Sequence, residues 1–257
     1  MDFGIENRLS KIFKPKSGKT VMLAVDHGYF QGPTTGLVNL EETIKPLGNL
    51  ADCLFITRGM LRNCVDKKIK SSICLRVSGG PSILQELSNE DIVVSMEEAL
   101  RLNASGVGMS IFVGAENEDR SIVNLGRLVN EAEKYGMPVL AITAVGKEMG
   151  RDARYLGLAC RIAAELGSRI VKTYYCKDFY KITESCPVPV VMAGGKKIPE
   201  KDALKMTENA IKEGASGVDM GRNIFQSANP IKMIKAIKAI VHEGADSKEA
   251  YKLYSKK

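Results

Sequence analysis

The segment Arg169-Ile-Val-Lys-Thr-Tyr-Tyr175 decides how the rest of this sequence of 257 residues is interpreted. It is short and rich in β-branched and aromatic residues, and it carries one lysine, Lys172, between apolar neighbours. A run of this kind predicts a β-strand that is buried on both faces. Because an ammonium group is costly to bury, a lysine at this position needs either a carboxylate partner or a chemical purpose.

Similar runs recur at intervals of about 20 to 35 residues, and most are followed by a segment with helical periodicity. The strands that we expect occupy residues 21–26, 53–57, 73–78, 106–113, 138–143, 169–175, 188–194 and 217–221. Helices are expected at 118–135 and 199–213, and another begins at Asn229-Pro230. A doubly wound sheet would also cover both faces of the strands, but eight units favour the α/β class and a (β/α)₈ TIM barrel.

No linker rich in proline, glycine or serine interrupts the series, so we expect a single domain over residues 1–257. Residues 1–20 precede the first strand and residues 245–257 follow the last barrel helix. Either segment could cap the bottom of the barrel or take part in a subunit contact. The segment Gly28–Gly36 is too rich in glycine for a helix and is expected to form a mobile loop over the barrel mouth.

The composition is that of an ordinary globular protein, with 44% hydrophobic and 26% charged residues. The net charge of +7 comes from scattered lysines, and there is no tryptophan and no basic run flanked by aromatic residues, so nucleic-acid binding is not expected. A basic mouth for anionic metabolites explains the same charge, as does a solvated basic surface. Without a signal peptide or a stretch of about 18 consecutive apolar residues, the chain is expected in the cytoplasm with no membrane partner.

The cysteines lie far apart, without a CxxC pair or a Cys/His cluster at zinc spacing. They are Cys53, Cys64, Cys74, Cys160, Cys176 and Cys186. We therefore expect reduced, mostly structural thiols and no metal site.

Chemistry in a barrel takes place at the carboxyl ends of the strands. The side chain of Lys172 must point either into the barrel or out toward the helices. Burial lowers the pKa of a lysine and a nearby cation lowers it further, which leaves a neutral amine able to attack a carbonyl and form a Schiff base. The sequence is equally compatible with a lysine that is paired to a carboxylate for structural reasons.

Glycines at two neighbouring strand ends indicate a phosphate site. Gly194 and Gly195 follow the seventh expected strand, and Gly221 and Arg222 follow the eighth. Glycine lets backbone N–H groups approach an anion closely, and the loops after strands seven and eight hold phosphate in many barrels. Isolated glycines often merely end strands, but two such ends, one of them with an arginine, favour phosphate.

Asp26 and His27 close the first expected strand. Asp26 is the expected carboxylate partner of Lys172, where it would hold the amine or relay a proton; alternatively it caps the turn into Gly28. For His27, a substrate contact and a structural role are equally compatible with the sequence, whereas His242, near the end of a lysine-rich helix, is expected on the surface. Three further lysines are either surface residues or contacts to a second, larger anionic substrate, namely Lys147, Lys196 and Lys197.

Together these motifs resemble the archaeal-type class I aldolase family. The resemblance rests on Asp26-His27-Gly28, Lys172-Thr173, Ala193-Gly194-Gly195 and the run from Gly217 to Phe225, and it covers about residues 4 to 254. It implies a barrel subunit, a Schiff-base lysine, no bound cofactor, and assembly into a homo-oligomer that is often a decamer.

The runs 19–37 and 217–227 are similar to a thiolase branch of this family that acts in autoinducer-2 breakdown. That similarity implies transfer of an acetyl group from a phosphorylated diketone to coenzyme A, with acetyl-CoA and dihydroxyacetone phosphate as products. Coenzyme A would then be a co-substrate. The sequence is compatible with either an imine or an acetyl group on Lys172.

One departure bears on the choice of reaction. Family members that cleave fructose 1,6-bisphosphate carry a Tyr-Pro-Arg-Gly-like segment after the fifth strand, whose tyrosine is the acid/base, whereas here Thr143 stands at that position. An aldol cleavage needs this base, but cleavage of a 1,3-dicarbonyl needs it less because the leaving carbanion is an enolate. The sequence thus favours the thiolase over two alternatives, a Schiff-base aldolase acting on a ketose phosphate and a phosphosugar-binding protein without turnover.

Overall fold

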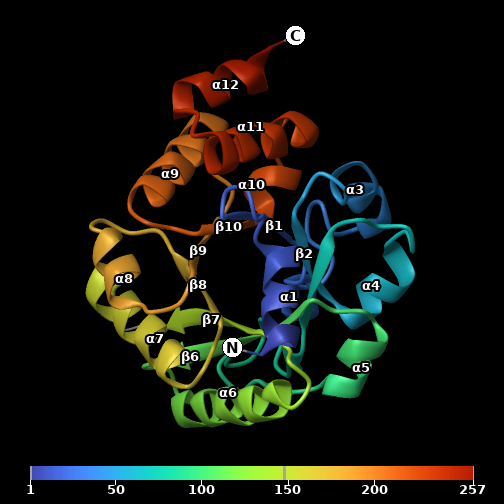
Figure 1. Ribbon diagram of the computed structural model, residues 1–257, viewed down its shortest axis with the longest axis vertical. Coiled ribbons are helices and arrows are strands. Elements are labelled where there is room, and N and C mark those ends of the chain that lie inside the picture. Colours follow the sequence, from blue (N-terminus) through green and yellow to red (C-terminus); the bar gives the residue numbers. More distant parts are fainter. Residues whose placement is uncertain (1, 147–148, 257) are drawn as a thin grey trace.

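The computed structural model describes residues 2–146 and 149–256. Its core is a closed barrel of parallel strands in the order β1-β10-β9-β8-β7-β6-β3-β2, and Figure 1 shows helices on the outside of this barrel. The barrel strands are β1 (Thr20–Ala24), β2 (Cys53–Thr57), β3 (Ser72–Arg76), β6 (Gly106–Val113), β7 (Val139–Val145), β8 (Ile170–Tyr174), β9 (Val190–Ala193) and β10 (Gly217–Met220). Every expected strand segment forms one of them, so the predicted (β/α)₈ TIM barrel is confirmed.

The helices that surround the barrel alternate with its strands along the chain. They are α3 (Leu40–Leu47), α4 (Arg58–Cys64), α5 (Met96–Arg101), α6 (Glu118–Glu133), α7 (Ala153–Glu165), α8 (Tyr180–Ser185), α9 (Glu200–Lys212) and α11 (Pro230–Glu243). Asn229 caps α11 by accepting a hydrogen bond from the backbone of Lys232, and Pro230 takes the first position, where its missing N–H costs nothing. The three helices that the sequence predicted are therefore confirmed to within two residues at each end.

The strands are apolar on both faces because both faces are covered. Outward side chains pack against the helices, and inward side chains form a separate cluster inside the barrel. Along β8, Val171 belongs to the outer cluster and Ile170 to the inner one. Since side chains alternate along a strand, Lys172 points into the barrel.

Helix α1 (Phe3–Ile12) closes the amino end of the barrel, and in Figure 1 it lies across the middle of the strands. Its last residue, Ile12, is fully buried in the inner cluster. Phe55 fills the barrel next to it so tightly that a Cβ at Gly108 would lie 2.7 Å from the ring. Of the two terminal segments, α1 is thus the cap, whereas α12 (Ser247–Ser255) packs outside against α9 and α11.

Two details of the fold differ from the expectation. The segment 28–36 was expected to contain no helix, but it begins with the short helix α2 (Gly28–Gln31). This helix ends at Gly32, which has a φ of 74°. The glycines stand at the two ends of this turn, where they do not oppose it. In addition, β4 (Ser78–Gly79) and β5 (Asp91–Ile92) form a small antiparallel sheet beside the barrel, too short to be recognised from periodicity.

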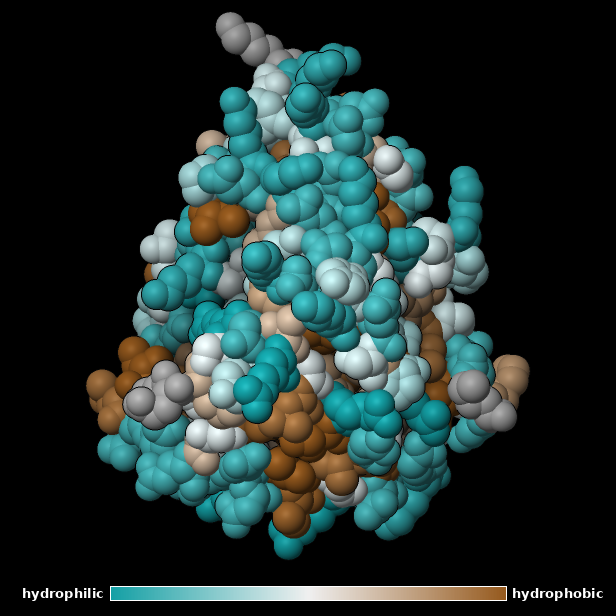
Figure 2. All heavy atoms as spheres, turned by 90° about the vertical axis from the view of Figure 1, so that its left-hand side faces the viewer, coloured by the Kyte–Doolittle hydropathy of each residue, from teal (hydrophilic) through white to brown (hydrophobic). Residues whose placement is uncertain are grey.

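The face shown in Figure 2 is mostly hydrophilic but carries a hydrophobic patch at the height of α6 and α7. The exposed large apolar side chains on these two helices are Val123 and Leu158. No helix in the described ranges is long and apolar enough to cross a membrane. All six cysteines are unpaired and all but Cys64 are buried, as expected for structural thiols.

Candidate active site

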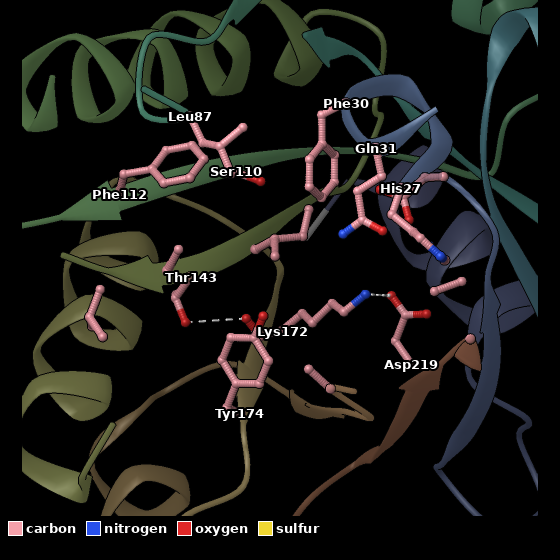
Figure 3. A pocket seen from close by; sticks show the side chains of 18 of the residues that line it. His27, Phe30, Gln31, Leu87, Ser110, Phe112, Thr143, Lys172, Tyr174 and Asp219 are labelled. Atoms are coloured by element: carbon pink, nitrogen blue, oxygen red, sulfur yellow. Dashed lines mark hydrogen bonds and ion pairs between the residues drawn. The ribbon is translucent and has the colours of Figure 1, made fainter. Parts of the chain in front are cut away.

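A cavity of about 420 Å³ opens at the carboxyl ends of the strands. This volume is within the range of small-molecule sites. Side chains from widely separated parts of the chain meet there, as Figure 3 shows. The predicted site residues that line it are Asp26, His27, Lys172, Gly194, Gly195, Gly221 and Arg222. The structure therefore brings the whole predicted set to one cavity.

The amine of Lys172 lies beside a carboxylate to which sequence reasoning gave no role. Its Nζ is 2.8 Å from Oδ2 of Asp219 on β10, the contact drawn as a dashed line in Figure 3. The ring of Phe55 lies 5.3 Å from the same nitrogen. Asp219 is buried, and its other oxygen, Oδ1, has no hydrogen-bond partner among residues 2–146 and 149–256. That oxygen is a buried acceptor without a partner in the part of the chain that the structure describes.

Asp26 lines the same cavity but pairs with Arg76, because its Oδ2 lies 3.4 Å from Nη1 of that arginine. The prediction that Asp26 is the direct partner of Lys172 is therefore wrong. The order of the strands explains the difference, since β10 lies two places from β8 around the barrel and β1 lies three places away. The side chain of Asp219 reaches the amine, whereas Asp26 acts on it only through its charge.

Two carboxylates keep Lys172 in its ammonium form. Burial lowers the pKa of Lys172, but the charges of Asp219 and Asp26, together with the hydrogen bond to Asp219, outweigh burial and raise the pKa above its ordinary value. Burial also raises the pKa of Asp219. Of the two alternatives left open by the sequence, the structure therefore has the lysine paired with a carboxylate, and the proton of Lys172 has to move before this residue can attack a carbonyl.

A buried charged cluster beside the cavity went unnoticed in the sequence. The guanidinium of Arg76 donates to Glu90 at 2.6 Å and to Ser110 at 2.8 Å. The hydroxyl of Tyr29 accepts from Arg76 and donates to Glu90. The cluster fixes Asp26 and Ser110 at the cavity wall and joins β3 to α2. The signal that could have revealed it is an arginine near the end of an expected apolar strand.

The glycines after β9 and β10 occupy positions that other residues fit poorly. Gly195 has a φ of 66°, in the left-handed region. A Cβ at Gly221 would lie 2.2 Å from a backbone carbonyl of β1. The side chain of Asn223 joins the two loops, because its Nδ2 donates to the carbonyl of Gly194 at 2.6 Å. Backbone groups and Arg222 thus share one end of the cavity, and their use for phosphate stays a prediction.

His27 is packed in the structure and also lines the cavity. Its ring stacks on Phe225, with 5.9 Å between the ring centroids. Its Nε2 is buried and has no hydrogen-bond partner among the described residues. Burial lowers the pKa of His27, against the opposing charge of Asp26, so the ring is held neutral. The packing role is thus observed, and the substrate contact stays a prediction.

The remaining predicted residues have different surroundings. His242 is not a surface residue as expected, since its side chain is 14% exposed and its Nε2 lies 2.7 Å from Oδ2 of Asp52. Lys196 lines the cavity, whereas Lys197 pairs with Glu200 at 2.9 Å. One further lysine lies outside the described residues, namely Lys147. Within the described ranges, no group of three or more histidine, cysteine, aspartate or glutamate side chains could hold a metal ion.

Thr143 uses its hydroxyl for structure. Its Oγ1 lies 2.9 Å from the hydroxyl of Thr173 and donates to the carbonyl of Lys172 at 3.3 Å. The side chain is 1% exposed. A hydroxyl that is occupied in this way is a poor acid or base for a bound substrate. The absence of a tyrosine noted in the sequence is therefore not compensated by Thr143.

Comparisons with known proteins agree with this geometry. The model of the DeoC/LacD family aldolases matches residues 20–227. A relative from Klebsiella pneumoniae is 56% identical over 99% of this chain and 86% of its own length, and one from Escherichia coli K12 is 54% identical over 99% and 88%. Both are named 3-hydroxy-5-phosphonooxypentane-2,4-dione thiolase.

Among solved structures, an archaeal fructose-1,6-bisphosphate aldolase has a TM-score of 0.84 and 29% identity, over 93% of this chain and 99% of that chain. It was solved with its catalytic lysine covalently bound to the carbinolamine intermediate of the substrate.

Proposed function

Because this chain belongs to the DeoC/LacD family of aldolases, we propose that it transfers an acetyl group from 3-hydroxy-5-phosphonooxypentane-2,4-dione to coenzyme A. The products are acetyl-CoA and dihydroxyacetone phosphate. The observation that carries the proposal is the buried pair of Lys172 and Asp219 in a cavity that also contains the glycine-lined ends of β9 and β10. Two relatives at 54% and 56% identity carry the corresponding thiolase name, which supports the choice of substrate.

In this proposal the phosphate binds at Gly194, Gly195, Gly221 and Arg222. These residues follow β9 and β10, and β8 with Lys172 lies directly beside β9. One methylene separates the phosphate group from the nearer carbonyl of the diketone. That carbonyl therefore comes to the lysine, and the acetyl end extends away from the phosphate.

The lysine then serves as an electron sink. The amine of Lys172 adds to the nearer carbonyl and water leaves, which forms an iminium ion. The thiol sulfur of coenzyme A bonds to the acetyl carbon, the bond between the acetyl carbon and the hydroxyl-bearing carbon breaks, and its electron pair moves into the iminium group to give an enamine. The proton from the thiol is delivered to the enamine carbon, and water releases dihydroxyacetone phosphate and Lys172. Atoms and electrons balance without a redox partner.

Asp219 has the geometry to accept the proton of Lys172. Its carboxylate is the group that contacts the ammonium, at 2.8 Å, and burial raises its pKa, which makes it a better base than an exposed aspartate. Transfer within the pair also removes two opposite charges from a buried site. Asp26 contributes charge, and its contact with Arg76 holds it in position.

A second candidate reaction is aldol cleavage of a ketose phosphate such as fructose 1,6-bisphosphate. The 29% identity with the archaeal aldolase favours it. It requires a group that removes a proton from the substrate hydroxyl, and the hydroxyl of Thr143 is bonded to Thr173 instead. The thiolase reaction does not need this base, so it is the better match to the cavity. A binding protein without turnover is disfavoured because the family and the named relatives are enzymes.

The test combines product analysis with trapping. The wild-type enzyme should form acetyl-CoA from the phosphorylated diketone, and borohydride reduction in the presence of dihydroxyacetone phosphate should add that molecule to Lys172, as detected by mass spectrometry. Lys172→Met should lose both properties. Lys197→Met is the matched control, since Lys197 pairs with Glu200 outside the cavity, and it should retain both. Fructose 1,6-bisphosphate cleavage at a comparable rate without coenzyme A would favour the aldolase instead.

We also propose that the enzyme works in the cytoplasm, where coenzyme A and phosphorylated metabolites are available, and that it forms a homo-oligomer. The resemblance to the class I aldolases supports the oligomer. Sedimentation velocity tests it, and a single species with the mass of one chain at micromolar concentration would contradict it.

A further inference from the structure

The cavity has two chemically different sides. Its wall toward β9, β10 and β1 is polar and includes Lys196, Arg222 and His27. On the other side, α2, β7, β6 with the loop after it, and the segment between β4 and β5 contribute apolar side chains among polar ones such as Gln31, Glu86 and Ser110. We call the apolar members the apolar wall, which consists of Phe30, Leu87, Phe112, Ala115, Ile142, Ala144 and Val145. Figure 3 shows Phe112 and Leu87 close to Ser110 and on the opposite side of the pocket from Asp219.

The phosphorylated diketone does not explain the apolar wall. Its phosphate, hydroxyl and two carbonyl groups are polar, and only its terminal methyl group is apolar. Burying polar groups against aromatic rings without hydrogen bonds costs free energy. The polar groups of the diketone should therefore bind on the polar side of the cavity, which leaves most of the apolar wall without a contact. A second and less polar molecule would account for it.

Exposed apolar side chains also occur on the rim beside the apolar wall. The segment that carries Leu87 also exposes Ile83 and Leu84, at 58% and 86% of their surface. The N–H of Ile83 donates to the carbonyl of Phe30 at 3.0 Å, so this segment and α2 form one rim of the cavity. The buried hydroxyl of Ser88 accepts hydrogen bonds at 3.1 Å from Asn117 and anchors the rim. The segment that carries Leu87 thus has two exposed apolar side chains outside the cavity and one that lines it.

We propose that the apolar wall binds the pantetheine arm of coenzyme A and guides its thiol to the acetyl carbonyl. This inference rests on the proposed function. The arm is a narrow chain of methylene and amide groups, and Phe30, Leu87 and Phe112 offer it apolar contact. The thiol then reaches the acetyl carbon from the side opposite the phosphate, and the apolar surroundings exclude the water that would otherwise hydrolyse the acetyl group.

The test uses Leu87→Ala and Phe112→Ala, with Leu158→Ala as the matched control, since Leu158 lies on α7 and does not line the cavity. Both wall variants should raise the KM for coenzyme A by about tenfold, which is the loss expected from removing one large apolar contact. The KM for the phosphorylated diketone and the borohydride trapping of dihydroxyacetone phosphate should not change. Phe112→Leu should restore most of the affinity for coenzyme A, and thermal unfolding verifies that each variant is folded.

Failure of this inference and failure of the proposed function give different results. Acetyl-CoA formation by wild type with no change of the coenzyme A KM in either wall variant would overturn the inference alone, as would an equal rise of both KM values. A second test needs no turnover: dihydroxyacetone phosphate is first linked covalently to Lys172 by borohydride reduction, and the binding of coenzyme A to this adduct is then measured by calorimetry. Binding there that Leu87→Ala weakens would support the wall even if the wild-type enzyme formed no acetyl-CoA, and absence of binding would reject it.

Discussion

Lys172 and Asp219 form a buried ion pair, with 2.8 Å between Nζ and Oδ2, and the charge of each affects the pKa of the other. Burial lowers the pKa of the lysine, and the two nearby carboxylates raise it by more. Asp219→Asn removes the nearer charge, so the pKa of Lys172 should fall. The pH at which borohydride trapping of dihydroxyacetone phosphate reaches half of its maximum should therefore move to lower pH. A profile that stayed in place would mean that Asp219 does not control the amine.

Asp26→Asn is the comparison for this experiment. Asp26 raises the pKa of Lys172 through its charge but forms its ion pair with Arg76. The pH profile should move in the same direction and by less than with Asp219→Asn. An effect larger than that of Asp219→Asn would restore Asp26 as the main partner of the lysine.

Arg76 is predicted to matter for stability as well as for the cavity. Its side chain is 3% exposed and that of its partner Glu90 is 2% exposed. Arg76→Met leaves Glu90 as a buried charge without its cation, which should lower the free energy of unfolding by about 3–5 kcal/mol in urea denaturation. Arg161→Met removes a pair with Glu165 whose side chains are 56% and 62% exposed, and it should cost less than about 1 kcal/mol. Similar losses in the two variants would contradict the role of the cluster.

At the scale of the elements, the turn from β10 into α10 (Arg222–Phe225) depends on the absence of a side chain at Gly221. A Cβ there would lie 2.2 Å from the carbonyl of Ala24 in β1. Gly221→Ala should push the two strand ends apart, lower the melting temperature and weaken inorganic phosphate binding. Gly126 in α6 has open space around it, so Gly126→Ala should stabilise the protein by about 0.5–1 kcal/mol. If Gly221→Ala changed neither the melting temperature nor phosphate binding, the turn would be able to rearrange around the added methyl group.

The barrel could be predicted because its signal is local. Each strand is a short apolar run, as in Ile170–Tyr174, and each helix has its own periodicity and end signals, such as Asn229-Pro230. The helix α2 could not be predicted, because glycine content argued against it although the glycines lie only at its ends. The sheet of β4 and β5 has two residues in each strand, and such a length gives no periodicity.

The site could be predicted as a set of residues but not as a set of contacts. Lys172 and the glycine pairs stand out by residue type at strand ends, and the structure brings them to one cavity. Which carboxylate meets the lysine depends on the order and register of the strands around the closed barrel. Asp219 lies far from Lys172 in the sequence, and only the barrel brings them within 2.8 Å. The same holds for His242 and Asp52.

At the scale of the whole molecule, Asp52 joins the last barrel helix to the first two strands. It directly precedes β2, accepts a hydrogen bond from the N–H of Val21 in β1, and contacts Lys238 and His242 of α11 at 2.9 and 2.7 Å. Burial raises the pKa of Asp52, but hydrogen bonds from His242, Lys238 and Val21 outweigh burial and hold it below the ordinary value. The carboxylate therefore stabilises the closed barrel while it is ionised.

This pKa predicts an acid-sensitive part of the stability. A carboxyl group with a lowered pKa in the folded state contributes stability above its unfolded pKa of about 3.9, and the contribution is lost as pH falls through the folded pKa. Asp52→Asn should cost about 1.5–3 kcal/mol at pH 7, measured by urea denaturation. The gap between wild type and variant should narrow below about pH 4. In a Lys238→Met background, the difference in unfolding free energy caused by Asp52→Asn should be smaller. A difference that does not depend on pH would contradict the role of the Asp52 charge.

The cap formed by α1 predicts an order of binding for the proposed thiolase reaction. Ile12 and Phe55 fill the barrel at its amino end, so reactants and products pass through the mouth, and the molecule that binds deepest has to enter first and leave last. We therefore expect the phosphorylated diketone to bind before coenzyme A, and acetyl-CoA to depart before dihydroxyacetone phosphate. Dihydroxyacetone phosphate should then inhibit competitively against the diketone and non-competitively against coenzyme A. A ping-pong pattern, with parallel double-reciprocal lines, would show instead that the first product leaves before the second substrate arrives.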